Sequence, residues 1–487
     1  MVADWMQVEW FGWRAILVGI IMWIVLLGFL QSRGYLDRWN ATRALGFILM
    51  IRTQKGKASL ERVSKYRRFW RGYGEVSLWI CRLSMAVVFL LILFTFVVAL
   101  LFPPNVDPPT ASELIAIPGL NPVIPLGWGV LAFIVCLVIH EFGHGLQARA
   151  HGMRIRSFGL LLLGPLPLGA FAEPEYDELM RAPSRERQRL FAAGPATNLF
   201  AGFICLLLLG SVGTQIAAGQ AGVHSSGIVE NSGADLAEMK PYDIIVAINE
   251  TQISDLNSFS EEIATYSAGD TIQLTVIRSG FDDEVRLNAT LSDKHEYFLK
   301  EGHTNSSLEQ SGIEVGDPFL GVVGLSEGTY AIDRLTGPFT KNNQAGIIER
   351  ALYLPIHVVN LLVIPFEYKG NAMHPAQEEM LVADGGIGTF VGLGVLLFIV
   401  NLLFWMIWVN LLLGFTNLIP MVPFDGGHLF RDMVHDFTRG LNKIGRKMKL
   451  WNWHPIKLQN FAHKTSAWSS LVFLFLLLFT IIAPYFG

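Results

Sequence analysis

The segment Leu126–Ile139 is uninterrupted in its apolar character and runs directly into the motif His140-Glu-Phe-Gly-His144. Such a segment is predicted to be a helix in a membrane, because a helix satisfies its own backbone polar groups where no water can do so. Ionisable side chains at membrane depth are costly and in general have a function. The placement of this motif therefore constrains both the fold, which must be built from membrane-spanning helices, and the chemistry.

The spacing within the motif predicts a metal site. On a helix, His140 and His144 are one turn apart on the same face, so both imidazoles can bind one Zn²⁺. Glu141 lies beside the open position of such an ion, where its carboxylate can accept a proton from water. The alternative is a helix whose two histidines only form local hydrogen bonds, and the membrane setting disfavours it. The motif thus predicts a zinc hydrolase with Glu141 as the catalytic base.

The composition indicates a polytopic α-helical membrane protein that carries a soluble part, because the chain is 52% hydrophobic and only 16% charged. About six stretches are apolar and long enough to cross a bilayer: 12–31, 79–102, 127–148, 190–212, 389–414 and 466–484. The three cysteines all lie in apolar segments, so no disulfide framework is predicted. The net charge of −4 gives no sign of a nucleic-acid partner, and we predict none.

The distribution of Lys and Arg predicts the orientation. The 32–78 loop is rich in both residues, whereas the 103–126 loop has neither. By the positive-inside rule the 32–78 loop is cytoplasmic, the N-terminus is outside, and His140 and His144 lie toward the cytoplasmic half of their helix. The apolar segment 351–366 is short and contains two prolines, so we predict that it is interfacial or re-entrant. Counting it as a span would carry residues 415–426 to the face opposite His144.

A catalytic zinc site usually has three protein ligands, and the third must come from another part of the chain. Glu173 and Glu175 are of the right type but lie in a loop flanked by prolines. Asp425 is favoured, because it follows the 389–414 span on the predicted cytoplasmic side, in a Pro- and Gly-rich stretch that can turn toward the helices. The alternative for Asp425 is a cap at a helix end.

These motifs together resemble the site-2 protease family of intramembrane zinc metalloproteases, in its PDZ-containing prokaryotic form. The resemblance rests on three segments and covers 127–215 and 389–430: His140 to Gly152, Gly194-Pro-Ala-Thr-Asn198, and Asn417 to Gly426. It implies that His140, His144 and Asp425 bind Zn²⁺. It also implies that Asn417 orients or contacts substrate, and we place Asn198 with it among the substrate-binding residues.

The segment Phe158–Phe171 is apolar, too short to span as a helix, and interrupted by glycines and prolines. The family resemblance implies a re-entrant β-hairpin near the zinc. A transmembrane substrate must be unwound before cleavage, and an unpaired strand edge can replace its lost backbone hydrogen bonds. We therefore predict that Gly169, Ala170 and Phe171 bind substrate. The alternative is a short interfacial loop.

Residues 216–350 are predicted to form a soluble α+β domain inserted between two spans and placed outside the cytoplasm. Asp243–Ile248 and Ile272–Val276 are typical of strands, and Leu256–Tyr266 of a short helix between them. The run Gly227–Asn249 resembles a PDZ domain of the protease-associated kind. The predicted organisation has four parts: 1–126, an N-terminal membrane region with a basic loop; 127–215, the catalytic core; 216–350, the PDZ-like domain; and 351–487, a C-terminal membrane region.

The function predicted from the sequence is that of an intramembrane zinc endopeptidase. Its substrate would be a single-span membrane protein already trimmed outside the membrane, such as a tethered regulator or a signal-peptide remnant, and its surroundings membrane lipid. A catalytically silent scaffold that binds partners through the PDZ-like domain is the alternative. A metal transporter is a weaker third possibility, because one compact motif with a general-base glutamate suits hydrolysis better than transit.

Overall fold

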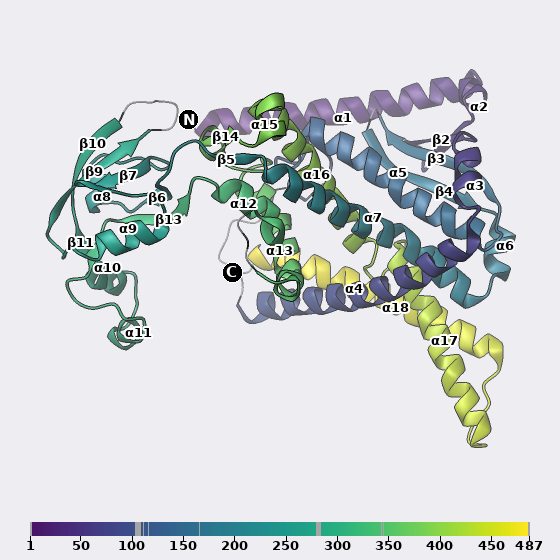
Figure 1. Cartoon of the computed structure of the whole chain (residues 1–487). Coiled ribbons are helices and arrows are strands. Elements are labelled where there is room, and N and C mark those ends of the chain that lie inside the picture. Colours follow the sequence, from purple (N-terminus) through teal and green to yellow (C-terminus); the bar gives the residue numbers. More distant parts are fainter. Residues whose placement is uncertain are drawn as a thin grey trace. The chain divides into compact units, whose positions relative to one another are not determined.

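The structure, a computed structural model, describes residues 2–102, 109–110, 112–114, 116–164, 166–278, 284–341, 343 and 345–485. It divides into two compact units (Figure 1): Met1–Cys205 with Trp405–Gly487 form one, and Leu206–Phe404 form the other. The helices α7 (Ser184–Gly213) and α16 (Leu393–Thr416) belong in part to each of these ranges.

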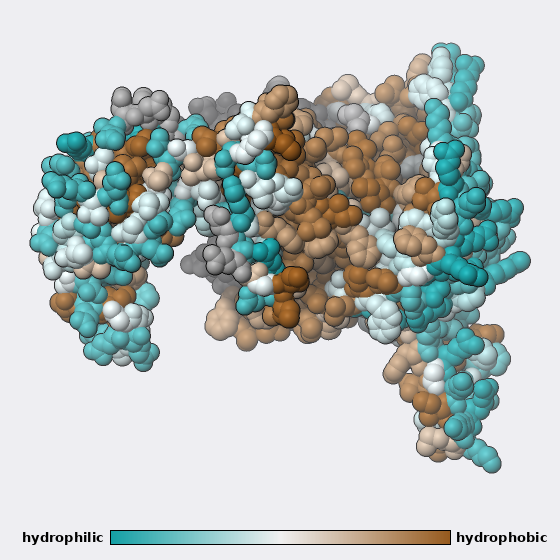
Figure 2. All heavy atoms as spheres, viewed as in Figure 1, coloured by the Kyte–Doolittle hydropathy of each residue, from teal (hydrophilic) through white to brown (hydrophobic). Residues whose placement is uncertain are grey.

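The first unit is mostly helical and contains one small sheet. Besides parts of α7 and α16 it consists of α1 (Val2–Ser32), α2 (Tyr35–Arg38), β1 (Ala41–Ala44), β2 (Ile48–Thr53), α3 (Lys57–Val63), α4 (Arg67–Leu101), α5 (Leu126–Ala150), β3 (Ile155–Leu163), β4 (Leu166–Pro174), α6 (Tyr176–Arg181), α17 (Asp425–Lys447) and α18 (Pro455–Ile482). Figure 2 shows apolar residues gathered over its long helices and polar residues over the end formed by α2, α3, α6 and α17. Side chains such as Phe94 on α4 and Phe475 on α18 are exposed although they are apolar. A continuous apolar surface of this kind is expected of a protein embedded in lipid.

Six of the described helices are long and apolar enough to cross a membrane: α4, α5, α7, α13 (Ile347–Glu367), α16 and α18. Five of them contain spans predicted from the sequence. The remaining predicted span, 12–31, lies in α1, where the described apolar part is the shorter stretch Leu17–Ser32. The protein is therefore an integral membrane protein with six candidate spans.

The segment 351–366, which the sequence marks as short, is part of a longer helix. It lies within α13, a continuous helix of 21 residues that passes through Pro355 and Pro365. A proline removes one backbone hydrogen bond, yet a helix continues through it when one face is packed. Here His357, Leu361 and Ile364 form a buried face of α13. By length and composition α13 is a candidate span, and the prediction that the segment 351–366 is interfacial or re-entrant stays a prediction.

The sheet of the first unit has the strand order β1-β2-β3-β4, and all pairs are antiparallel. A β3–β4 hairpin lies where the family resemblance implies one, and its re-entry into the membrane stays a prediction. Gly159 faces Phe171 across this hairpin. A Cβ on Gly159 would lie 2.1 Å from Cζ of Phe171, so only glycine leaves room for that ring. The sequence analysis did not predict β1 and β2, which lie within the basic 32–78 loop.

The second unit has an α+β domain followed by helices. Its elements are β5 (Ile216–Ala218), β6 (Val223–Ile228), α8 (Gly233–Leu236), β7 (Ile244–Ile248), β8 (Thr251–Gln252), α9 (Leu256–Ile263), β9 (Thr271–Ile277), β10 (Glu284–Thr290), β11 (Ser292–Asp293), α10 (Lys294–Lys300), α11 (Asn305–Gln310), β12 (Pro318–Phe319), β13 (Val322–Glu327), α12 (Tyr330–Thr336), α13, α14 (Pro375–Glu379), β14 (Leu381–Ala383) and α15 (Gly386–Val391). The main sheet has the order β10-β9-β7-β6-β13, and β8 pairs with β7. The strands and the helix predicted from the sequence correspond to β7, β9 and α9.

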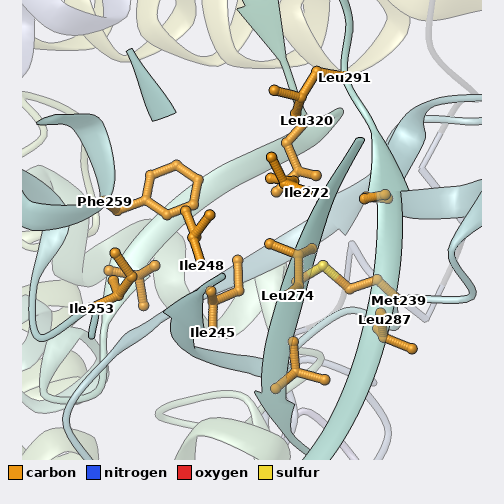
Figure 3. Packing of buried hydrophobic residues seen from close by; sticks show 14 residues of the cluster. Met239, Ile245, Ile248, Ile253, Phe259, Ile272, Leu274, Leu287, Leu291 and Leu320 are labelled. Carbon is orange, nitrogen blue, oxygen red and sulfur yellow. The ribbon is translucent and has the colours of Figure 1, made fainter. Parts of the chain in front are cut away.

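The core of this domain lies between the sheet and α9 (Figure 3). Ile272, Leu274 and Val276 alternate along β9 and are all 0% exposed, which is the period of a strand with one buried face. Phe259 of α9 packs against the same cluster. Burial of such side chains supplies most of the stability of a domain of this size, about 1.5–3 kcal/mol for each large side chain.

His224 on β6 is a buried histidine. Its burial predicts that the stability of this unit depends on pH. It is 1% exposed, and its Nε2 lies 3.3 Å from Nε2 of Gln377 on α14. Burial lowers the pKa of His224 from 6.5 to about 4. The contribution of neutral His224 to stability is therefore complete above pH 6.5 and is lost as the pH falls from 6.5 toward 4, because the unfolded chain binds the proton first.

We expect the free energy of opening of the second unit to fall by about 2 kcal/mol between pH 7 and pH 5 through this group alone. Hydrogen exchange of the β6, β7 and β9 amides in the full chain, corrected for intrinsic rates, measures this free energy of opening. His224→Gln should remove most of that pH dependence, whereas His303→Gln, at an exposed position, should leave it unchanged. An equal loss of protection in wild type and His224→Gln would contradict the assignment.

Candidate metal centre

Three side chains of the first unit converge on one point. Oδ2 of Asp425 lies 3.1 Å from Nε2 of His140 and 3.1 Å from Nε2 of His144, and the two Nε2 atoms are 3.1 Å apart. Ligand atoms bound at 2.0–2.2 Å to a tetrahedral ion are separated by roughly 3.3 Å, so the spacing fits Zn²⁺. Among the described residues, His140, His144 and Asp425 form the group of side chains that could hold a metal ion.

The tautomers of the two histidines support a cation site. Nδ1 of His140 lies 2.8 Å from Oδ1 of Asn198, and Nδ1 of His144 lies 2.8 Å from the carbonyl oxygen of Leu190. Each Nδ1 therefore carries the proton as the donor, which leaves a lone pair on each Nε2. Two lone pairs and a carboxylate oxygen that face one another repel unless a cation lies between them. The residues present thus fit the metal that the sequence predicts.

Close packing of α5 and α7 makes this geometry possible. A Cβ on Gly194 would lie 2.3 Å from Nε2 of His144 and 2.7 Å from Nε2 of His140. A Cβ on Gly143 would lie 2.8 Å from the carbonyl oxygen of Ala193. Any larger side chain at either glycine would push the helices apart or occupy the place of the metal. The glycines inside both motifs are therefore explained by the distance between the two helices.

Asn198 has a different role from the one predicted. Its side chain is 0% exposed, and besides accepting from His140 it donates to the carbonyl oxygen of Cys136 at 3.2 Å and to Oδ1 of Asn410 at 2.9 Å. A direct contact with substrate does not fit this position, so we correct its role to that of an orienting residue. Such partners fix the ring of a metal-binding histidine and raise its basicity. The sequence signal was its spacing after Gly194, which did not reveal the partner.

Asp425 is the first residue of α17 and is held by the turn before it. The amide of Gly426 donates to the carbonyl oxygen of Asn417 at 2.6 Å, and a Cβ on Gly426 would lie within 2.6 Å of the backbone of Leu418. Two turns further along α17, Asp432 accepts two hydrogen bonds from Arg187 of α7, at 2.9 Å and 3.1 Å. This ion pair fixes α17 against α7. The ion pair could not be predicted from the sequence, because residues 245 positions apart give no local signal.

The other predicted residues are placed around this centre. Asn417 directly follows α16, is partly exposed, and donates from its side chain to the carbonyl oxygen of Leu413 at 3.0 Å. Gly169, Ala170 and Phe171 lie on β4, the last strand of the sheet. On the same strand, the amide of Ala172 donates to Oε2 of Glu141 at 2.7 Å, a contact that the sequence did not reveal.

Glu173 and Glu175, the alternatives for the third ligand, face elsewhere. Oε2 of Glu173 accepts from the hydroxyl of Ser157 at 2.9 Å, and its carboxylate lies near Arg156 at 3.7 Å. Glu175 precedes α6 at its N-terminal boundary. Neither belongs to the group that could hold a metal. The structure therefore brings together His140, His144 and Asp425 and not the two glutamates.

We expect Asp425→Ala to lower the zinc content of the purified protein strongly, because two imidazoles alone bind Zn²⁺ weakly. Glu173→Ala should keep the wild-type zinc content, since its carboxylate is turned to Ser157. Elemental analysis of the two variants, purified in parallel, makes the comparison. Full zinc stoichiometry in Asp425→Ala would remove this residue from the ligand set.

Comparison with known proteins identifies the family. The model of peptidase family M50 matches residues 128–450. An uncharacterized protein of Methanocaldococcus jannaschii is 24% identical over 443 residues, 90% of each chain. Zinc metalloprotease Rip1 of Mycobacterium tuberculosis is 24% identical over 61% of this chain and 82% of its own, and the regulator of sigma-E protease RseP of Salmonella typhimurium is 26% identical over 40% of this chain and 55% of its own. The chain is therefore a metalloprotease that belongs to peptidase family M50, the site-2 protease family.

Proposed function

We propose that this protein is an intramembrane zinc endopeptidase that cleaves membrane-spanning segments of proteins already trimmed outside the membrane. One observation carries the proposal: His140, His144 and Glu141 lie on α5, a helix apolar enough to span a bilayer, beside the last strand of a small sheet, and Asp425 of α17 completes the group that could hold a metal. Catalytic groups at this depth suit a peptide bond that lies within the membrane. A scaffold without activity would not need them there.

Glu141 is the proposed general base. A zinc ion held by His140, His144 and Asp425 would lower the pKa of a water molecule toward about 7. Glu141 would accept the proton of that water and return it to the amine that leaves. The amide of Ala172 holds one carboxylate oxygen of Glu141 and leaves the other available for this transfer.

The free edge of β4 is the proposed platform for an unwound substrate. The amide of Ala172 points away from β3 toward Glu141, so by the period of two the amide of Ala170 points to the same side. An extended substrate segment can pair with this side of β4 by strand addition. Asn417 lies at the end of α16 near Asp425 and is a candidate for a further polar contact with the substrate.

The direction of α7 and α16 supports the proposed topology. Gly202 of α7 lies against Asn410 of α16, whereas Gly414 lies against Leu199 and Pro195, so the two helices are antiparallel. If both cross the membrane, the chain between them begins and ends on the same side and crosses an even number of times. A single crossing by α13 does not satisfy this requirement, which favours an interfacial or re-entrant α13. With the basic loops cytoplasmic, the metal centre lies toward the cytoplasm and residues 216–350 lie outside.

The α+β domain is the proposed PDZ-like selector of substrates. The run Gly227–Asn249, which resembles a protease-associated PDZ domain, extends from the end of β6 through α8 and β7. Among its described residues no group of side chains could hold a metal. We therefore assign it a role in excluding proteins that still carry bulky outer domains, and no part in the chemistry.

Replacement of Glu141 by Gln should keep zinc, because Glu141 is not a ligand, and should lower the rate of cleavage by about 10²–10⁴-fold. Single-turnover cleavage of a single-span test substrate, together with zinc analysis, measures both. Glu173→Gln is the matched control, since Glu173 lies on β4 itself and its carboxylate is turned to Ser157. Near-normal turnover by Glu141→Gln would exclude the mechanism, and a wild type that binds zinc without cleaving any substrate would favour the scaffold.

Removal of the selector domain should spare a trimmed substrate. The structure narrows the deletion to 221–327, because Gly328 returns to within contact of Ala218 and Gln220, so a short Gly/Ser bridge can join the ends. We expect the deleted protein to cleave a short-ectodomain substrate at the wild-type rate and to accept the full-length substrate that the wild type excludes. A deletion that binds zinc but cleaves neither would show that the domain is part of the catalytic machinery.

A further inference from the structure

A cavity of about 400 Å³ lies in the first unit between α5 and the sheet. It is walled mainly by apolar groups, among them Val138 and Phe142 of α5, Phe158 and Leu160 of β3, and Ala170 of β4, and Glu141 also lines it. Lys55 reaches the lining from the turn after β2. An apolar cavity of this size beside the proposed catalytic carboxylate is expected to bind an apolar group.

We propose that this cavity is the specificity pocket of the protease and receives a bulky aliphatic or aromatic side chain from a substrate residue next to the scissile bond. The inference rests on the proposed function. Its first support is the position of Glu141, which serves the scissile bond in the proposed mechanism and is part of the wall. An occupant of the cavity is therefore within about one residue of that bond.

The second support is the alternation of the strands. Ala170 lines the cavity, and Ala170 and Leu160 are paired across the hairpin, so this face of the sheet is turned toward α5. A substrate strand added to β4 alternates between the same two faces, and every second side chain then points toward the cavity. Ala170 leaves the volume open because its side chain is small. The substrate supplies the missing side chain.

The third support is energetic. Transfer of one Leu or Phe side chain from water into such a cavity contributes about 1.5–3 kcal/mol, and one methylene more or less changes kcat/KM by about 10- to 200-fold. For a transmembrane substrate the side chain leaves lipid instead of water, so shape decides more than polarity. The size of the pocket should therefore set which residue is preferred, and a substitution of Val138 on α5, which lines the cavity, changes that size.

Val138 is the best position for a test. Its side chain lines the cavity one turn before Glu141, and it is 53% exposed, so a change there does not disturb a packed core. Leu131, two turns earlier on α5 and 46% exposed, is absent from the described lining and is the matched control. Val138→Phe fills the cavity and Val138→Ala enlarges it. Leu131→Phe and Leu131→Ala make the same changes elsewhere on the helix.

The measurement is kcat/KM of the full chain for a set of single-span substrates that differ only in the residues flanking the mapped cleavage site, with Ala, Leu, Phe or Trp at each. Wild type should prefer Leu or Phe over Ala. Val138→Phe should lower the Phe-to-Ala ratio by about 10-fold or more, and Val138→Ala should raise the Trp-to-Phe ratio, while both Leu131 variants keep the wild-type ratios. Ratios in both Val138 variants equal to those of the Leu131 variants would overturn the proposal.

Other outcomes separate the causes. If a lipid acyl chain fills the cavity, Val138→Phe changes all rates by one factor and leaves the ratios unchanged, which overturns the pocket. If Val138→Phe fails to bind zinc, Val138→Ala, which only removes atoms, decides by the Trp-to-Phe ratio. If the Val138 variants cleave in a zinc-dependent manner with unchanged substrate ratios, only the pocket proposal is contradicted. If the wild type cleaves no substrate in a zinc-dependent manner, the proposed function itself is contradicted.

Discussion

The close approach of α5 and α7 is the contact on which the catalytic region depends. Gly143 and Gly194 let the two helices touch, and Gly194 leaves the space between the Nε2 atoms of His140 and His144 free of side-chain atoms. The same approach brings the carbonyl oxygen of Leu190 to His144 and the side-chain oxygen of Asn198 to His140. A wider separation would remove both hydrogen bonds and leave the histidines free to rotate. The candidate metal site and the hydrogen bonds that orient its histidines therefore depend on the same helix packing.

Polar groups buried among apolar helices must be satisfied by one another, and this requirement shapes the surroundings of the site. Asn198 joins three helices, because it contacts His140 and Cys136 on α5 and Asn410 on α16. In an apolar setting an unpaired amide costs several kcal/mol, so such a network favours one arrangement of the helices over its alternatives. The Arg187–Asp432 pair does the same at the polar end, where it holds α17 and with it Asp425.

The small sheet complements the helices, because an edge strand exposes backbone hydrogen-bonding groups that a helix uses internally. A helix uses its backbone hydrogen bonds internally and cannot bind an extended chain through them, whereas the last strand of a sheet can. β4 lies beside Glu141 through Ala172, and the cavity between this sheet and α5 adds space for side chains. In the proposed function, chemistry and substrate binding belong to different elements that meet at Glu141. The α+β domain has a separate core around Ile245 and Leu274.

The sequence by itself determined what depends on short-range pattern. The apolar runs predicted five of the candidate spans, and the helical spacing of His140 and His144 predicted two side chains of the group that could hold a metal. The hairpin at Phe158–Phe171 was implied by the family resemblance. Only the tertiary structure brought Asp425 and not Glu173 to the two histidines, placed Asn198 beside His140, and added β1 and β2 to the sheet. The physical reason is that these features depend on contacts between residues far apart in the chain, and such contacts leave no periodicity in the sequence.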